Sequence, residues 1–422
     1  MEEMGNATKS VHIADPGKQA RSQSGIPIVP VFDGYRALAI AGVVLLHMSI
    51  LSGVVATSDS GILAQIVWGT VGHAVDILFV ISGFVVFLPT VARKGRSGTL
   101  SSYAIRRAAR ILPAYWMVLL ISYLLILLTT VSPDVDTPPL RDLGLHFVGL
   151  QVPALTFLSD ITPGLGVNPP LWTLSAEIIF YVVLPFIAAT YFRHPLAGLV
   201  VAAFITLAWN WSFENLNLVD SWVDLGISNL EIFRQSLIST LQFPSWAFSF
   251  GLGMTGAWAY VKWRVIAETE AGKSTMRWVL AFALTGFAFF AYLAGGFAGS
   301  AEVALVAQYS RFSPEISIGY SGFLALSMVA IALGPTRFRW PFANRPMRWL
   351  GDISYGIYLS HMLFTFYFAS YFSLPDDGSL WAFLICTLAI VPLSVLYGYT
   401  SARFLEQPLR RWARKFGRRQ HN

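Results

Sequence analysis

The sequence contains few charged residues and almost no cysteine. Only 12% of its 422 residues are Asp, Glu, Lys or Arg, whereas 55% are hydrophobic, and its mean hydropathy is +0.58. This composition excludes an ordinary soluble protein and indicates a polytopic membrane protein. Cys386 is the single cysteine, so an internal disulfide and a cysteine metal cluster are excluded as well.

Several common sequence signals are also missing. There is no P-loop and no GxGxxG, so we expect neither nucleotide hydrolysis nor a dinucleotide cofactor. Residues 1–30 lack the apolar region and cleavage site of a signal peptide, and their polar composition predicts a disordered cytoplasmic tail. We expect one transmembrane domain over 31–408 and a basic cytoplasmic tail over 409–422.

The apolar segments predict an all-α bundle of ten membrane-spanning helices. They lie at about 36–56, 66–91, 110–131, 171–192, 196–213, 241–262, 278–298, 317–334, 350–373 and 380–405. Two long connections, 132–170 and 214–240, fall on the side predicted to be outside the cytoplasm. Each connection either covers a site or is an ordinary loop.

The Lys and Arg residues are divided unequally by this topology. With the N-terminus in the cytoplasm, 25 of the 29 lie on the cytoplasmic side and three, Arg141, Arg234 and Arg311, lie on the other side. Arg36 stands at the start of the first span. The split follows the positive-inside rule, which predicts that both termini are cytoplasmic.

His47 and Arg36 lie on one face of the first predicted span. Eleven residues turn a helix by three full turns plus about 20° and raise it by about 16 Å. If Arg36 lies at the membrane surface, His47 lies near the midplane, where an ionisable group is costly and often functional. The alternative is a neutral histidine that is hydrogen-bonded by a neighbouring helix.

Three other predicted spans also carry polar side chains at depth. The second has His73 and Asp76 one turn apart, with Ser82 deeper. In the fourth, Glu177 is about 8–10 Å below the outer surface by helix rise, on one face with Thr173 and Tyr181. In the ninth, Ser354, Tyr358 and His361 form one stripe. We interpret His47, Asp76, Glu177 and His361 together as one polar chamber, although ion pairing within the bundle is the alternative.

An arginine pair marks the start of the third predicted span. Arg107 and Arg110 share a helix face in SSYAIRRAARILPAYW, and Ser101 or Ser102 is the expected cap. Guanidinium groups beside a helix N-terminus suit a phosphate. The alternative is that these arginines only mark the cytoplasmic side.

These segments together resemble the membrane-bound acyltransferase 3 family. The matching pieces are FDGYRALAIAGVVLLH, VDILFVISGF, YAIRRAARILPAYW, LWTLSAEIIFYVVLP, SYGIYLSH and FLEQP, in the family's order over residues 32–408. The resemblance implies ten membrane helices and transfer of an acyl group from a cytoplasmic acyl-CoA to an acceptor hydroxyl. Many members carry a C-terminal esterase-like domain, which we do not expect within this sequence.

The resemblance also implies roles for individual residues. His47 matches the family's essential histidine, Arg36 its paired arginine, and Arg107 and Arg110 the arginines associated with the donor. We add Glu177 to the catalytic group, as a residue that orients the imidazole or binds the acceptor. Ser82 and Tyr115 are further candidates for acyl-CoA binding. The candidates for supporting or acceptor-binding roles are Asp76, His73, Trp172, Tyr358 and His361.

The expected chemistry leaves two roles open for His47, a general base or a nucleophile that carries the acyl group. The expected donor is acetyl-CoA or another short acyl-CoA, without a bound cofactor or metal, and no nucleic-acid partner is expected. A cell-envelope glycan or glycolipid is the preferred acceptor, and a small secondary metabolite such as a macrolide is the alternative. A proton-coupled transporter is an alternative of another class, because buried His, Asp and Glu can relay protons.

Overall fold

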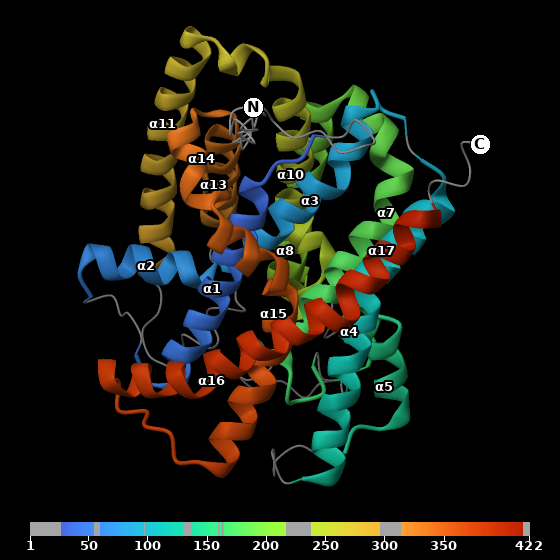
Figure 1. The fold of residues 1–422 in the computed structure, drawn as a ribbon, viewed down its shortest axis with the longest axis vertical. Helices are drawn as coiled ribbons and strands as arrows, with labels where there is room; N and C mark the ends of the chain where they lie inside the picture. The colour runs from blue at the N-terminus through green and yellow to red at the C-terminus, as the bar shows by residue number, and fades with distance from the viewer. Residues whose placement is uncertain are drawn as a thin grey trace, which may run out of the picture.

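The computed structural model describes residues 27–54, 60–96, 98–129, 137–158, 161, 164–216, 238–295 and 314–416. Within these ranges the fold is all-α and has no β-strand, as predicted. The helices (Figure 1) are α1 (Val31–Leu51), α2 (Ile62–Gly72), α3 (Ala74–Ala92), α4 (Leu100–Leu128), α5 (Leu140–Phe147), α6 (Gln151–Ala154), η1 (Pro169–Leu171), α7 (Trp172–Arg193), α8 (Pro195–Leu216), α10 (Phe243–Trp263), η2 (Ile266–Glu268), α11 (Glu270–Gly295), α13 (Pro314–Leu333), α14 (Thr336–Ala343), α15 (Arg345–Tyr371), α16 (Leu380–Ser401), the π-helical turn η3 (Ala402–Glu406) and α17 (Gln407–Phe416).

Eight helices in the described part of the chain are long and apolar enough to cross a membrane. Helices α10 and α15 cover the sixth and ninth predicted spans and have 21 and 27 residues, but they are not among those eight. Helix α10 contains several glycine and serine residues, which lower its mean hydropathy. Small residues allow α10 to pack closely against its neighbours in the bundle. A Cβ added at Gly83 of α3 would lie 2.1 Å from the carbonyl oxygen of Phe250 on α10.

The second predicted span, 66–91, is not one helix. Helix α2 ends at Gly72 and α3 begins at Ala74, and His73 between them is the cap residue of both helices. Figure 1 shows that α2 lies across the direction of α1 and α3. A single glycine is a weak signal for a helix end, and both helices are apolar. A prediction from hydropathy alone therefore places them in one span.

The long connection predicted at 132–170 is more than a surface loop. It forms α5 and α6, and Asn168, which is fully buried, donates from Nδ2 to the backbone oxygen of Leu359 on α15 at 2.9 Å. The segment therefore enters the bundle, and α7 begins inside it rather than at a surface. Most of the second long connection, 217–237, lies outside the described residues.

Helical structure continues past the predicted domain boundary at 408. Helix α16 continues through η3 into α17, and α17 packs against α4. The described chain is helical to Phe416, so most of the expected tail belongs to the bundle. Residues 1–26 and 417–422 lie outside the described residues.

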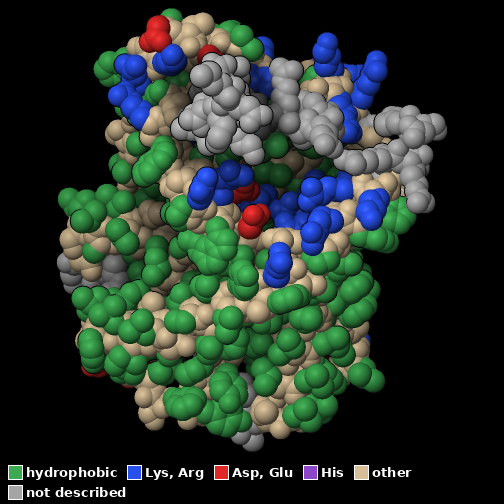
Figure 2. Space-filling model, in the orientation of Figure 1, with side chains coloured by type: hydrophobic (Ala, Val, Ile, Leu, Met, Phe, Trp, Pro, Cys, Tyr) green, Lys and Arg blue, Asp and Glu red, His purple; other side chains and the backbone are tan. Residues whose placement is uncertain are grey.

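Charge is concentrated at one end of the molecule. On the face shown in Figure 2, Lys and Arg side chains gather over the upper half, and the lower half shows hydrophobic and other uncharged surface with almost no charged side chains. This distribution matches the asymmetry expected from the sequence. The assignment of the basic end to the cytoplasm remains a prediction.

Candidate active site

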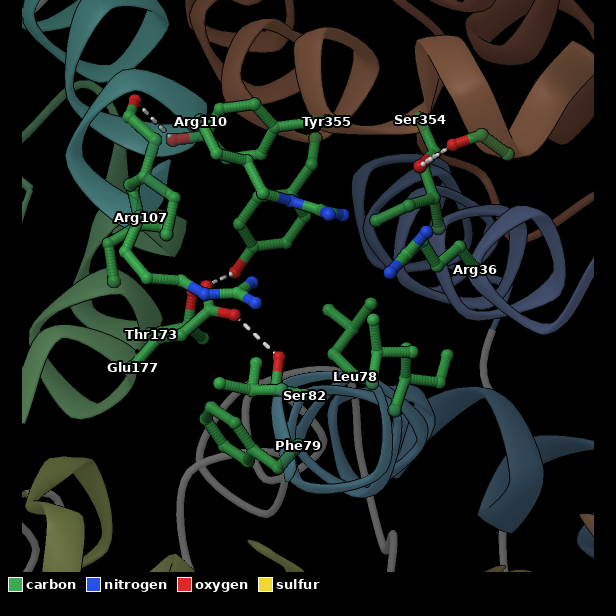
Figure 3. Close-up of a pocket in the computed structure, with 18 of the residues that line it drawn as sticks. Arg36, Leu78, Phe79, Ser82, Arg107, Arg110, Thr173, Glu177, Ser354 and Tyr355 are labelled. Atoms are coloured by element: carbon green, nitrogen blue, oxygen red, sulfur yellow. Dashed lines mark hydrogen bonds between the residues drawn. The ribbon is translucent and has the colours of Figure 1, made fainter. Parts of the chain in front are cut away.

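A charged cavity lies between α1, α3, α4, α7, α15 and the junction of α16 with α17. It has about 930 Å³ of space without atoms, part of which is open to solvent. Its charged lining residues are Arg36, Arg107, Arg110, Glu177, Asp352, Glu406 and Arg410. Figure 3 shows the guanidinium groups of Arg36, Arg107 and Arg110 directed into the same space. Elements far apart in the sequence therefore combine to concentrate cations here.

Two of these arginines are ion-paired. Arg36 contacts the carboxylate of Asp33 at 3.1 Å, and Arg410 contacts that of Glu406 at 3.3 Å. Both pairs join residues on neighbouring turns, with spacings i,i+3 and i,i+4. The positive charge of these two side chains is therefore already balanced within the protein.

Arg107 and Arg110 have no such partner. Neither forms an ion pair with any described carboxylate, and the Nε atom of Arg107 is buried without a hydrogen-bond acceptor. The Arg107 guanidinium lies 5.6 Å from the ring centroid of Tyr181, a cation–π contact. The helix cap differs from the prediction, because Thr99 accepts from the backbone N–H of Ser102. Guanidinium groups in a cavity that form no direct ion pair are suited to an anionic ligand.

Glu177 lies in the same cavity, near enough to Arg107 and Arg36 for its carboxylate to interact with them electrostatically. Its carboxylate accepts hydrogen bonds from the hydroxyls of Ser82 and Tyr181. The dashed line between Ser82 and Glu177 in Figure 3 marks the first of these bonds. Glu177 therefore faces the same cavity as Arg107 and Arg110, and its expected depth below the outer surface stays a prediction. The predicted alignment of Glu177 with Tyr181 on one helix face is confirmed.

His47 and His361 form a pair across α1 and α15. The distance from Nδ1 of His47 to Nε2 of His361 is 3.1 Å, and Nδ1 of His361 lies 2.7 Å from the backbone oxygen of Tyr358. A carbonyl oxygen can only accept, so Nδ1 of His361 carries a proton and Nε2 of a neutral ring is the acceptor. His47 then donates from Nδ1, which leaves the lone pair on its Nε2 available.

Tyr358 separates the histidine pair from the cavity. Tyr358 lines the cavity, whereas neither histidine does. Its hydroxyl is hydrogen-bonded to the hydroxyl of Thr173 at 2.7 Å and to the backbone oxygen of Pro170 at 2.9 Å. His361 follows one turn later on α15, and His47 lies about two turns beyond Ile40, a lining residue of α1. The ring centroids of Tyr358 and His361 lie 5.9 Å apart, so one side chain links the cavity lining to the pair.

Asp76 does not join these groups, so the prediction of one chamber with four ionisable members is wrong. Its carboxylate accepts from Ser249 at 2.8 Å and from Ser321 at 2.6 Å, and it lies 3.5 Å from Nδ1 of His73. The ring of His73 packs against that of Tyr320. This cluster joins α3, α10 and α13. It contributes no residue to the lining of the charged cavity that contains Arg36, Arg107 and Arg110, which we call the arginine cavity.

Tyr115 and Trp172 also lie outside the cavity lining. The Tyr115 hydroxyl is fully buried and donates to the backbone oxygen of His146 at 2.7 Å. Trp172 packs against the ring of Trp246, with 5.6 Å between the centroids. Both side chains hold α4 and α7 to neighbouring segments.

Glu406 and Arg410 line the cavity, although neither was a candidate from the sequence. Glu406 is only 3% exposed and lies in the π-helical turn η3, where it also accepts from the hydroxyl of Ser401. Single π-helical turns occur often at functional sites. One feature of the sequence could have indicated this pair. Glu406 precedes Arg410 by four residues at the end of the last apolar segment, a spacing typical of an ion pair on one helix face.

The described residues contain no group of three or more His, Cys, Asp and Glu side chains that could hold a metal ion.

Comparison with known proteins decides the family. A family model described as an acyltransferase domain, that of acyltransferase 3, matches residues 29–399. The chain belongs to this family. It is an acyltransferase and a multi-pass protein of the bacterial plasma membrane.

Two relatives are informative. Nodulation protein 10 of Rhizobium leguminosarum bv. viciae is 25% identical over 346 residues, which cover 79% of this chain and 81% of that protein. Peptidoglycan O-acetyltransferase OatA of Listeria monocytogenes serovar 1/2a is 23% identical over 406 residues, which cover 91% of this chain. The matched part is 56% of the Listeria protein, so this acyltransferase spans little more than half of that relative.

Proposed function

We propose that this acyltransferase moves a short acyl group from cytoplasmic acyl-CoA to a hydroxyl of a cell-envelope glycan or glycolipid. The observation that carries the proposal is a cavity in which Arg107 and Arg110 form no ion pair, and whose lining residue Tyr358 packs against His361 of the histidine pair. A donor with an anionic head and a reactive acyl end fits these two features together.

The arginines would hold the donor by its phosphates. CoA carries several negative charges, and hydrogen bonds between guanidinium groups and phosphate are strong and directional. Arg107 and Arg110 form no direct ion pair among the described residues, and Arg36 lies at the same cavity on α1. The pantetheine arm would then run along α1 and α15 toward Tyr358, which places the thioester near His47.

His47 would act through Nε2. As a general base, it takes the proton of the acceptor hydroxyl while that oxygen attacks the thioester carbonyl. The tetrahedral intermediate collapses, the carbon–sulfur bond breaks, and the imidazolium returns the proton to the leaving thiolate. His361 would hold the ring of His47 and fix its tautomer through the 3.1 Å bond.

A covalent route uses the same lone pair. Nε2 of His47 attacks the thioester carbonyl, and CoA leaves as the thiolate. The acyl-histidine then passes its acyl group to the acceptor oxygen, whose proton is released to solvent and balances the thiolate formed in the first step. Incubation with labelled acyl-CoA alone, followed by mass spectrometry of His47 peptides, separates the routes. An acyl adduct that disappears on adding acceptor supports the covalent route, and unmodified His47 during donor turnover supports the general-base route.

The acceptor is proposed from the relatives. The Listeria relative is by name an O-acetyltransferase of peptidoglycan, which is a cell-envelope glycan. A small secondary metabolite is the alternative acceptor for the same chemistry. Purified protein with labelled short-chain acyl-CoAs and a panel of glycan, glycolipid and macrolide acceptors distinguishes them by the labelled product.

Substitution of His47 tests the proposal as a whole. We expect His47→Ala to lower transfer by about 10²–10⁴-fold, since that is the typical contribution of a general acid–base group. His194→Ala is the matched control, because His194 is exposed between α7 and α8. Transfer at the wild-type rate by His47→Ala would contradict the proposal.

A further inference from the structure

A second hollow lies between the turn that links α10 to α11 and the turn that links α13 to α14. It has about 780 Å³ of space without atoms, part of it open to solvent. Its polar lining residues are Arg264, Glu268, Lys273, Thr336 and Arg339. None of its lining residues belongs to the arginine cavity. Both turns lie toward the upper end of the molecule in Figure 1, the end where the basic residues gather in Figure 2.

This second hollow has an excess of positive charge. Three cations line it against the single carboxylate of Glu268. Lys273 is balanced by an exposed partner, Glu270, at 2.7 Å. Arg264 and Arg339 form no ion pair with any described residue, and the Nε atom of Arg339 is buried without a hydrogen-bond acceptor.

Topology alone does not account for this arrangement. Basic residues that only mark the cytoplasmic side can extend their charged groups into water. A guanidinium N–H that is buried without an acceptor loses its hydration and gains nothing in return. An acceptor bound in the hollow beside Arg339 would offset this cost.

Two neighbouring features indicate what kind of acceptor this is. Thr336 begins α14, so the positive end of a helix dipole faces the same hollow as the arginines. Large apolar side chains flank the arginines and are exposed: Val265 is 75% exposed, and Trp340 is 67% exposed. Such residues beside basic ones are typical of the boundary between the membrane and water.

We propose that this second hollow binds a phosphate group, and that its natural source is the headgroup of an anionic phospholipid. Arg264 and Arg339 would hold the phosphate oxygens, and the exposed apolar side chains would lie among the acyl chains. Basic pockets between membrane helices on the cytoplasmic side bind anionic headgroups in this way. The site is separate from the arginine cavity, and the proposal does not depend on the function proposed above.

The test measures lipid retention by the full-length protein. Purified protein is titrated with phosphatidylglycerol or phosphatidylcholine, and bound lipid is counted by native mass spectrometry. The variant Arg264→Gln/Arg339→Gln is compared with Arg337→Gln/Arg345→Gln, which removes two exposed charges that line neither cavity. Inorganic phosphate and pyrophosphate are tested separately by their effect on the Tm of the wild-type protein.

We expect the wild-type protein to retain phosphatidylglycerol at least tenfold more tightly than phosphatidylcholine. Arg264→Gln/Arg339→Gln should lose this preference by about tenfold, and the control should keep it. A rise in Tm with phosphate in the absence of lipid selectivity would support the phosphate site and assign it to a soluble ligand. Equal losses in the two double variants, or no response of the wild-type protein to either lipid or phosphate, would overturn the proposal.

Discussion

Asp76 and the pair Arg107 and Arg110 both place charge among membrane-spanning helices, but their polar atoms are satisfied to different degrees. The Asp76 carboxylate is surrounded by two serine hydroxyls and the ring of His73. The two arginines have no carboxylate partner among the described residues, and Arg107 Nε has no acceptor. Buried charge that is hydrogen-bonded within the protein serves packing, whereas cavity-lining charge without a direct ion pair is suited to bind a ligand.

The largest effect on stability should come from Asp76. In Asp76→Leu the hydroxyls of Ser249 and Ser321 lose their acceptor, and breaking a buried charged network typically costs about 3–5 kcal/mol. The fraction of protein that remains folded on heating in detergent measures this loss. Asp352→Asn, at an exposed carboxylate, should leave stability unchanged. If Asp76→Leu were as stable as the wild-type protein but had lost acyl transfer, the comparison would fail. The Asp76 cluster would then serve the reaction rather than packing.

His361 should affect the reaction rather than the fold. His361→Phe removes the acceptor for Nδ1 of His47, and we expect kcat to fall by about tenfold with KM for the donor unchanged. His361→Gln keeps an oxygen near the position of Nε2 and should recover part of the rate. Steady-state kinetics of both variants measure the difference. Equal rates of the two variants would show that the hydrogen bond to His47 is not used.

Tyr115 should have the smallest effect of the three. Tyr115→Phe removes one hydroxyl that bonds to His146 and is bonded by Gln151, which should cost about 1 kcal/mol of stability. Transfer per folded molecule should stay at the wild-type rate because Tyr115 does not line the cavity. A raised KM for acyl-CoA in this variant would return Tyr115 to the donor site.

Local features of the site could be predicted from the sequence. The spacing of Arg107 and Arg110, the face shared by Glu177 and Tyr181, and the unusual depth of His47 follow from helix geometry. The pairing of His47 with His361 joins residues 314 positions apart, and no local pattern indicates it. The position of Glu177 depends on where α7 begins, and the described residues between 137 and 168 enter the bundle without a hydropathy signal strong enough to show it.

Donor binding tests the central claim most directly. The equilibrium affinity of the purified protein for acetyl-CoA should fall by about 10²-fold or more in Arg107→Gln/Arg110→Gln, since each charged hydrogen bond contributes about 1.5–3 kcal/mol. Arg337→Gln/Arg345→Gln, which removes the same charge elsewhere, should bind like the wild-type protein. Unchanged affinity in Arg107→Gln/Arg110→Gln would contradict the assignment of the arginine cavity to the acyl donor.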